Sequence, residues 1–181
     1  LLLLLSCFFD ISLVRFLLLT ANCFCNIGAV QFYDADDKCK KYGECYHLSS
    51  FALPLESAEY ACEGIGGHLS DIYSEKKANF LRGLHLSTDL YPFWVGLHCE
   101  TSSLCSGARN YTFDTNNYEN WCVKKAQPNF NNGNCVYEDY CSETSYGWFT
   151  AECDDIITDH YFSCQTDACS ISNFCSQESQ V

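Results

Sequence analysis

The sequence predicts an α+β domain that begins with a short strand and two helices and continues as short strands joined by long irregular loops. Apolar residues recur at helical spacing only between residues 54 and 85, and later they form short runs that are typical of strands. Helices and strands do not alternate along the chain, which argues against a parallel βαβ sheet. The chain has 15 cysteines among 181 residues, and disulfides can hold such loops in place.

The first strand is predicted at residues 45–48, where an apolar and aromatic segment is followed by two serines. The first helix is expected to begin at Pro54, because the missing N–H of proline is tolerated in a first turn, and to end near Gly64. Ser74 is a good N-cap and Glu75 follows it in the first turn, so a second helix is predicted there.

The later part of the chain is predicted to be rich in strands. Residues 93–97 form an unbroken apolar run, which is typical of a strand buried on both faces. Residues 98–133 are rich in Asn, Ser, Thr and Gly and predict long loops, with brief strands or anchors at 111–113 and 121–123. Further strands are predicted at 134–137, 147–151 and 159–164.

Acidic residues outnumber basic ones by 23 to 10, which gives a net charge of −13. Binding to nucleic acid or to an anionic membrane relies on cationic side chains, so neither is expected as a partner. The charge fits a soluble protein, or an acidic face for cations or basic partners. No C-x2-C pair is present for zinc, and neither H-E-x-x-H nor G-x-S-x-G occurs, so we expect no enzyme.

Residues 1–25 are predicted to be a signal peptide, followed by an acidic extension over residues 26–38. The leader has two apolar runs interrupted by Asp10 and Arg15, and neither run reaches the roughly 20 residues of a membrane-spanning helix. Cys23 and Cys25 fit the small-residue positions of a cleavage site after Cys25. The chain contains no methionine, so we expect the initiator to be missing. The prediction is a secreted protein with no stable membrane anchor, and a single-pass anchor is the alternative.

An ordered series of short motifs runs from residue 39 to residue 164. Each motif is weak alone, because apolar runs with tryptophan are common in cores, but the ordered set is specific. The motifs are Cys45-Tyr46, Ala58 to Cys62, Gly66-Gly67-His68-Leu69, Phe93-Trp94-Val95-Gly96-Leu97, Asn120-Trp121, Gln127-Pro128-Asn129, Asn134-Cys135-Val136, Trp148 with Cys153, and Tyr161-Phe162-Ser163-Cys164. This set resembles the C-type lectin-like domain. The resemblance implies two helices packed on small, mostly antiparallel sheets. Residues 165–181 have little apolar content and are predicted to be a polar tail.

The resemblance also implies a set of disulfides. The two that it implies directly are Cys62–Cys164, which would close a loop of about a hundred residues, and Cys135–Cys153. Cys39–Cys45 would be the extra bridge of the family's longer form. Proximity suggests one more pair, and elimination suggests two: Cys99–Cys105, Cys122–Cys141 and Cys169–Cys175.

In sugar-binding members of this family, calcium is held by oxygen ligands on both sides of a cis proline, in Glu-Pro-Asn or Gln-Pro-Asp. Gln127-Pro128-Asn129 is a hybrid of the two motifs, so Gln127 and Asn129 are the candidate calcium ligands. The neighbouring amides are further candidates for contact with a sugar: Asn131, Asn132 and Asn134. A simple turn is the alternative, since Pro-Asn sequences favour turns.

The family's second ligand motif, Trp-Asn-Asp, is replaced here by Trp148-Phe149-Thr150. Calcium requires 6–8 oxygen ligands, and carboxylate charge sets much of its affinity. We therefore expect the calcium site to be weak or lost unless a nearby carboxylate substitutes, the candidates being Glu138, Asp139 and Glu152.

The expected function is that of a secreted recognition module whose partner is a glycan or an extracellular protein. Carbohydrate would bind through Gln127-Pro128-Asn129, and the alternative is calcium-independent protein binding through the loops of residues 98–133. Asn110-Tyr111-Thr112 is an N-glycosylation sequon in such a loop, so we expect a glycan on Asn110.

Overall fold

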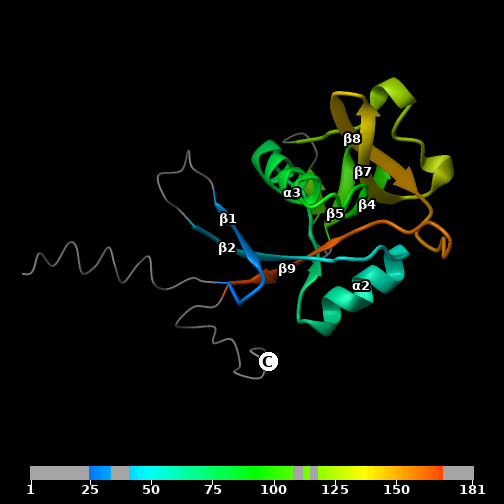
Figure 1. Ribbon diagram of the computed structural model, residues 1–181. Helices are drawn as coiled ribbons and strands as arrows, with labels where there is room; N and C mark the ends of the chain where they lie inside the picture. The colour runs from blue at the N-terminus through cyan, green and yellow to red at the C-terminus, as the bar shows by residue number, and fades with distance from the viewer. Residues whose placement is uncertain (1–24, 34–40, 108–111, 115–117, 169–181) are drawn as a thin grey trace, which may run out of the picture.

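The structure is a computed structural model, and it describes residues 25–33, 41–107, 112–114 and 118–168. A four-stranded sheet joins distant parts of this chain in the order β1-β2-β9-β3. Its strands are antiparallel and have the following bounds: β1 Val30–Tyr33, β2 Lys41–Leu48, β3 His68–Leu69 and β9 Ser163–Asp167. This sheet lies at one end of the domain in Figure 1.

A five-stranded antiparallel sheet, in the order β6-β5-β4-β7-β8, forms the other end. Its strands are β4 Phe93–Thr101, β5 Leu104–Gly107, β6 Thr112–Asp114, β7 Cys135–Ser142 and β8 Ser145–Ala151. The chain between β6 and β7 contains two short 3-10 helices, η2 (Val123–Lys125) and η3 (Phe130–Asn132). Figure 1 shows these turns beside the β7–β8 hairpin.

The two predicted helices are confirmed. Helix α2 spans Leu55–Gly64 directly after Pro54, and it buries Leu55, Ala58 and Cys62. Helix α3 spans Glu75–Ser87, and the side chain of Ser74 caps it by accepting a hydrogen bond from the Lys77 N–H at 3.2 Å. Both helices therefore begin where their local signals predict.

Strand β4 is buried on both faces at residues 93–97, as its apolar run predicts. Phe93, Val95 and Leu97 belong to one hydrophobic cluster, whereas Trp94 belongs to a second cluster on the opposite face. The indole N–H of Trp94 donates to the carbonyl of Leu53 at 2.8 Å, so its polar atom is satisfied inside the core. This strand links the two halves of the core.

Four of the predicted disulfides are present, namely Cys62–Cys164, Cys135–Cys153, Cys99–Cys105 and Cys122–Cys141. The prediction of Cys39–Cys45 is wrong, because Cys45 bonds to Cys25. A turn closed by the Ala29 N–H and the Asn26 carbonyl, together with the pairing of β1 and β2, brings Cys25 to Cys45. Cleavage after Cys25 would remove that cysteine, so a leader ending at residue 25 is incompatible with this bridge.

Several strand predictions also need correction. The strand predicted at 159–164 begins only at Ser163 and continues to Asp167, because His160 and Tyr161 form isolated bridges with other segments. Strand β1 lies in a segment predicted to be an acidic extension. Asn110, Cys39, Cys169 and Cys175 lie outside the described residues. No helix in the described ranges is both long and apolar enough to cross a membrane.

Candidate functional site

The segment Gln127-Pro128-Asn129 lies between η2 and η3, and its three residues are partly buried. The Gln127–Pro128 peptide bond is cis, as the family resemblance predicts. The Gln127 N–H donates to the Cys122 carbonyl at 3.2 Å, which ties the segment to the Cys122–Cys141 disulfide. The local backbone is thus held by its own short-range contacts.

Thr150 of β8 closes a network with this segment. The Gln127 Oε1 atom is 3.1 Å from the Thr150 N–H, 3.1 Å from the Thr150 hydroxyl and 3.2 Å from the Asn129 N–H. The Thr150 hydroxyl also lies 2.7 Å from the Asn129 carbonyl, to which it donates more favourably. Asn129 Oδ1 accepts from the Asn131 N–H at 3.3 Å. Both candidate ligand oxygens therefore already accept hydrogen bonds from the chain.

This donor set does not fit calcium. The N–H groups of Thr150 and Asn129 turn their positive ends toward Gln127 Oε1, where a calcium ligand would have to face the ion. Phe149 and Thr150 supply no carboxylate at the family position. Since carboxylates provide much of the affinity for calcium, these residues do not form a family-type site.

Glu138 cannot replace the missing carboxylate, because it is fully buried in an ion pair with Arg82 of α3. Arg82 donates from Nε to Glu138 Oε1 at 2.7 Å and from a terminal nitrogen to Oε2 at 3.0 Å. Burial raises the pKa of the Glu138 carboxyl, and the hydrogen bonds and charge of Arg82 act in the opposite direction. Tyr91 and Asn120 complete the shell at 3.4 and 3.5 Å.

The other predicted contact residues lie on η3 and just before β7. Asn131 and Asn132 are exposed on η3. Asn134 is partly buried, and its carbonyl accepts from the Cys99 N–H at 2.8 Å. The exposed amides of Asn131 and Asn132 are available for polar recognition at the surface of η3.

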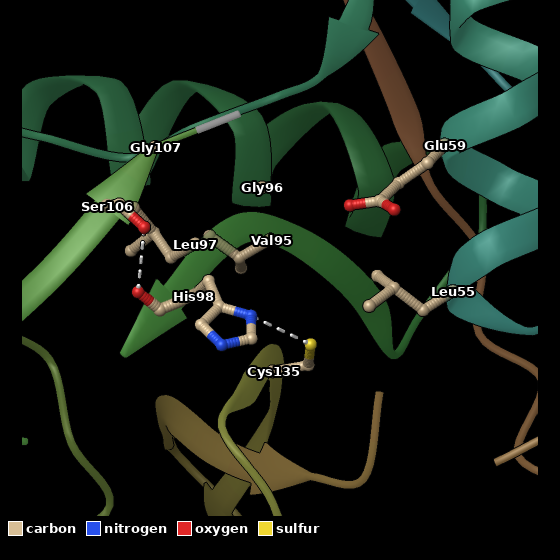
Figure 2. A pocket seen from close by; sticks show the side chains of 9 residues that line it. All are labelled: Leu55, Glu59, Val95, Gly96, Leu97, His98, Ser106, Gly107 and Cys135. Carbon is tan, nitrogen blue, oxygen red and sulfur yellow. Dashed lines mark hydrogen bonds between the residues drawn. The ribbon is translucent and has the colours of Figure 1, made fainter. Parts of the chain in front are cut away.

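A pocket of about 370 Å³ lies away from this motif, between α2 and the strands β4 and β5. Figure 2 shows Leu55 and Glu59 on the helix side and His98 and Ser106 on the strand side, with Cys135 beside His98. In the described part of the chain, His98, Cys135 and Cys153 are the one group of three His, Cys or acidic residues close enough to share a metal ion. Their two sulfurs are bonded to each other, so no thiolate ligands are present.

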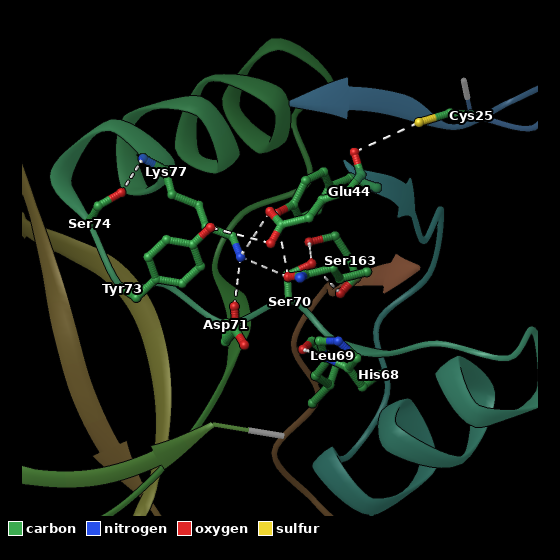
Figure 3. A network of polar contacts seen from close by, with 12 residues as sticks. Cys25, Glu44, His68, Leu69, Ser70, Asp71, Tyr73, Ser74, Lys77 and Ser163 are labelled. Atoms are coloured by element: carbon green, nitrogen blue, oxygen red, sulfur yellow. Dashed lines mark hydrogen bonds and ion pairs between the residues drawn. The ribbon is translucent and has the colours of Figure 1, made fainter. Parts of the chain in front are cut away.

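The most buried charged network has a structural role. Figure 3 shows the Lys77 ammonium, which lies 2.6 Å from Asp71 Oδ1 and 3.5 Å from Glu44 Oε2. It also donates to Gln165 Oε1 at 2.8 Å, and its side chain is completely buried. This network connects α3 to β2 and β9. A ligand cannot reach it.

His85 and Ser163 also resemble a base and a nucleophile, with 3.3 Å between Nε2 and Oγ. Both side chains are completely buried, and the His85 ring stacks on Phe93 at 4.0 Å. Burial lowers the pKa of His85 to about 4. A substrate has no access to this pair, which contributes to the core.

Sequence reasoning missed the Thr150 hydroxyl and the pocket beside His98. Thr150 stands where the family has an aspartate, so its position could be compared, but its contacts with Gln127 depend on the pairing of β7 with β8. The pocket joins residues 55–59 to residues 95–107 and 135. No local pattern brings those segments together.

Comparison with known proteins agrees with this architecture. The family model described as the lectin C-type domain matches residues 52–166. No curated protein sequence matches the chain. The solved structures include the C-type lectin domain of murine dendritic cell inhibitory receptor 2 in complex with an N-glycan. It is 20% identical, with 80% of this chain and 99% of that chain covered and a TM-score of 0.59.

Two other solved structures have similar folds. Human lithostathine is 19% identical, with 79% of this chain and 99% of that chain covered and a TM-score of 0.60. A calcium-independent type II antifreeze protein is 19% identical, with 81% and 96% covered and a TM-score of 0.58. Because the family model spans more than half of the sequence, and its match agrees with the two sheets, the two helices and the disulfides, the chain belongs to the C-type lectin domain family.

Proposed function

We propose that this chain is an extracellular recognition module. It binds its ligand without help from calcium, because Gln127 and Asn129 do not hold the ion. The observation that carries the proposal is the set of hydrogen bonds that Gln127 Oε1 accepts from Thr150 and Asn129. The five disulfides among the described residues support an oxidising compartment. Among proteins of similar fold, one antifreeze protein is described as calcium-independent, which is a precedent for this behaviour.

Calcium titration tests the proposal directly. We expect calcium and a chelator to leave the melting temperature of the wild-type protein unchanged, because the N–H groups of Asn129 and Thr150 already occupy the Gln127 oxygen that would face the ion. A double variant, Phe149→Asn with Thr150→Asp, rebuilds the missing ligand motif and removes the threonine hydroxyl. It is expected to gain calcium binding in calorimetry, weaker than about 10⁻⁴ M, because the other carboxylate is still absent. Thr150→Val is the matched control and should gain none. A chelator-sensitive melting temperature in the wild type would refute the proposal.

An extracellular protein is the partner class that the long loops support best. Val123 of η2 is 76% exposed, and Leu104 of β5 is 41% exposed. Moving an exposed aliphatic side chain from water to a complementary apolar protein surface is favourable. Binding of the labelled protein to an array of extracellular proteins should therefore weaken in Val123→Ser and Leu104→Ser. Ile65→Ser, which changes a residue that is 51% exposed at the end of α2, is the control.

Carbohydrate binding without calcium is the second candidate, favoured by the exposed amides of Asn131 and Asn132. A solved domain of similar fold is in complex with an N-glycan. A glycan array with calcium and with chelator separates the two candidates. A signal that persists in chelator and is lost in Asn131→Ala with Asn132→Ala would support the glycan. No signal in either condition would reject it.

A further inference from the structure

The Cys135–Cys153 disulfide has an environment that differs from the other bridges. His98 Nδ1 lies 3.6 Å from the sulfur of Cys135 and 3.7 Å from the sulfur of Cys153. These are sulfur hydrogen-bond distances, and Figure 2 shows the His98 ring directed at Cys135 inside the pocket. In the tautomer or cation that carries hydrogen on Nδ1, the ring presents a proton to this bridge.

The pocket adds a charged group to this arrangement. Glu59 faces the same cavity from α2, and Figure 2 shows its carboxylate on the side opposite His98. Burial and the neighbouring Glu63 raise the pKa of Glu59, and the charge of His98 acts in the opposite direction. Only the imidazolium form of His98 can give up the Nδ1 proton and leave a neutral ring, so this form would act as the acid.

Access to the bridge is unequal at its two ends. Cys153 follows β8 in a turn and is partly exposed, whereas Cys135 is 3% exposed at the start of β7. An incoming thiolate can therefore reach the Cys153 sulfur from solvent. Attack at one sulfur makes the other the leaving group, so the departing sulfur would be that of Cys135, next to His98.

We propose that Cys135–Cys153 is an exchange-reactive disulfide for low-molecular-weight thiols, with His98 as the proton donor to the departing sulfur. The thiolate of the small molecule forms a bond to the Cys153 sulfur, and the Cys135–Cys153 bond breaks. The electron pair leaves with the Cys135 sulfur, which takes the proton from His98 Nδ1. The product is a mixed disulfide on Cys153 and a free thiol on Cys135. A second small thiol then releases Cys153 as a thiol and leaves as the oxidised dimer.

The chain contains a matched bridge without this environment. Cys122–Cys141 also joins one buried cysteine to one partly exposed cysteine, and its sequence separation of 19 is close to the 18 of Cys135–Cys153. Among the described residues, no histidine forms a hydrogen bond with either of its sulfurs. Cys62–Cys164 is buried at both ends, so its opening reports unfolding of the domain.

The experiment exposes the folded, full-length protein to excess glutathione, stops the reaction with an alkylating reagent and quantifies each cysteine by mass spectrometry. We expect Cys135–Cys153 to open at least about tenfold faster than Cys122–Cys141, because a positioned acid accelerates departure of the sulfur. The first adduct should be glutathione on Cys153. His98→Ala should remove the difference between the two bridges. Thr101→Ala, on the same strand and away from the sulfurs, should keep it.

Four results would overturn the proposal. The first is an equal rate of opening for the two matched bridges, and the second is an unchanged rate in His98→Ala. The third is simultaneous opening of Cys62–Cys164, because that result would show that the thiol enters only after unfolding. An adduct on Cys135 in place of Cys153 would contradict the assigned direction of attack.

Discussion

Replacing Arg82 with methionine should destabilise the domain through the carboxylate that it leaves behind. Glu138 is fully buried, and Arg82 donates two hydrogen bonds to it at 2.7 and 3.0 Å. The remaining donors, Tyr91 and Asn120, are 3.4 and 3.5 Å away and carry no charge. The variant therefore has a buried anion without a cation.

The loss of one partner from a buried ion pair is worth about 3–5 kcal/mol, mainly because the other charge stays desolvated. A domain of this size loses roughly 2–4 °C in melting temperature for each kcal/mol, so a decrease of about 10 °C is expected. Removing the charge as well, in Arg82→Met with Glu138→Gln, should recover most of this loss, because the neutral amide needs no counter-ion. The double variant is expected to lie within about 2 kcal/mol of the wild type.

Urea unfolding followed by tryptophan fluorescence, with the disulfides intact, measures these differences. The single variant should also gain stability relative to the wild type as the pH is lowered. Without Arg82 the pKa of Glu138 rises further, so the folded state takes up a proton before the unfolded state does. A single variant that loses less than about 1 kcal/mol, or a double variant no more stable than it, would show that the pair does not carry the assigned energy.

Further perturbations test other parts of the fold. Replacing Cys62 and Cys164 by serine should lower the free energy of unfolding by about 5 kcal/mol. The same replacement of Cys135 and Cys153 should lower it by about 3 kcal/mol, because the shorter loop gains less entropy when it is released. Equal losses in urea unfolding would contradict this order. Burial lowers the pKa of both His85 and His160 to about 4, below the ordinary 6.5, so stability should be complete above about pH 6.5 and fall toward pH 4 as the unfolded state takes up protons. His160→Phe keeps a ring against Trp94 and Tyr137 and should make the melting temperature less dependent on pH in this range; an unchanged dependence would mean that His160 does not contribute. Gly133→Ala should cost about 2 kcal/mol or more, because its φ is +104° and a Cβ would lie 2.2 Å from the Ala151 carbonyl oxygen. Gly83→Ala in α3, where a Cβ meets nothing within 4 Å, should instead stabilise the domain by about 0.5–1 kcal/mol, because alanine loses less backbone entropy on folding. A destabilised variant would show that this entropy does not determine the outcome at Gly83.

The elements predicted best are those whose signals are local. The serine cap of α3 and the apolar run of β4 each depend on a few adjacent residues, and both are confirmed. Cys62–Cys164 was also predicted, because a family resemblance supplied the pairing that spacing alone leaves open. In contrast, Cys25 was assigned to the leader, so Cys39 was predicted to be the partner of Cys45. Only the pairing of β1 with β2 decides between them.

The candidate site divides in the same way. The cis bond before Pro128 and the loss of carboxylates at Phe149 and Thr150 could be inferred from motifs. The hydrogen bonds from Thr150 to Gln127 Oε1 could not be inferred in this way, because they form only when β8 brings Thr150 against the turn. The pocket beside His98 depends on α2 and β4 meeting through the core, and this is a property of the tertiary structure.

The arrangement of β1 and β9 in one sheet has a consequence for how the domain can be tethered. Both strands flank β2 at the end of the molecule remote from the β7–β8 hairpin, as Figure 1 shows. A linker or surface attached through either strand would thus hold the domain by the same end, with the Gln127 turn directed outward. Several copies arranged in this way would present their long loops in parallel, so that weak individual contacts could add up to avid binding.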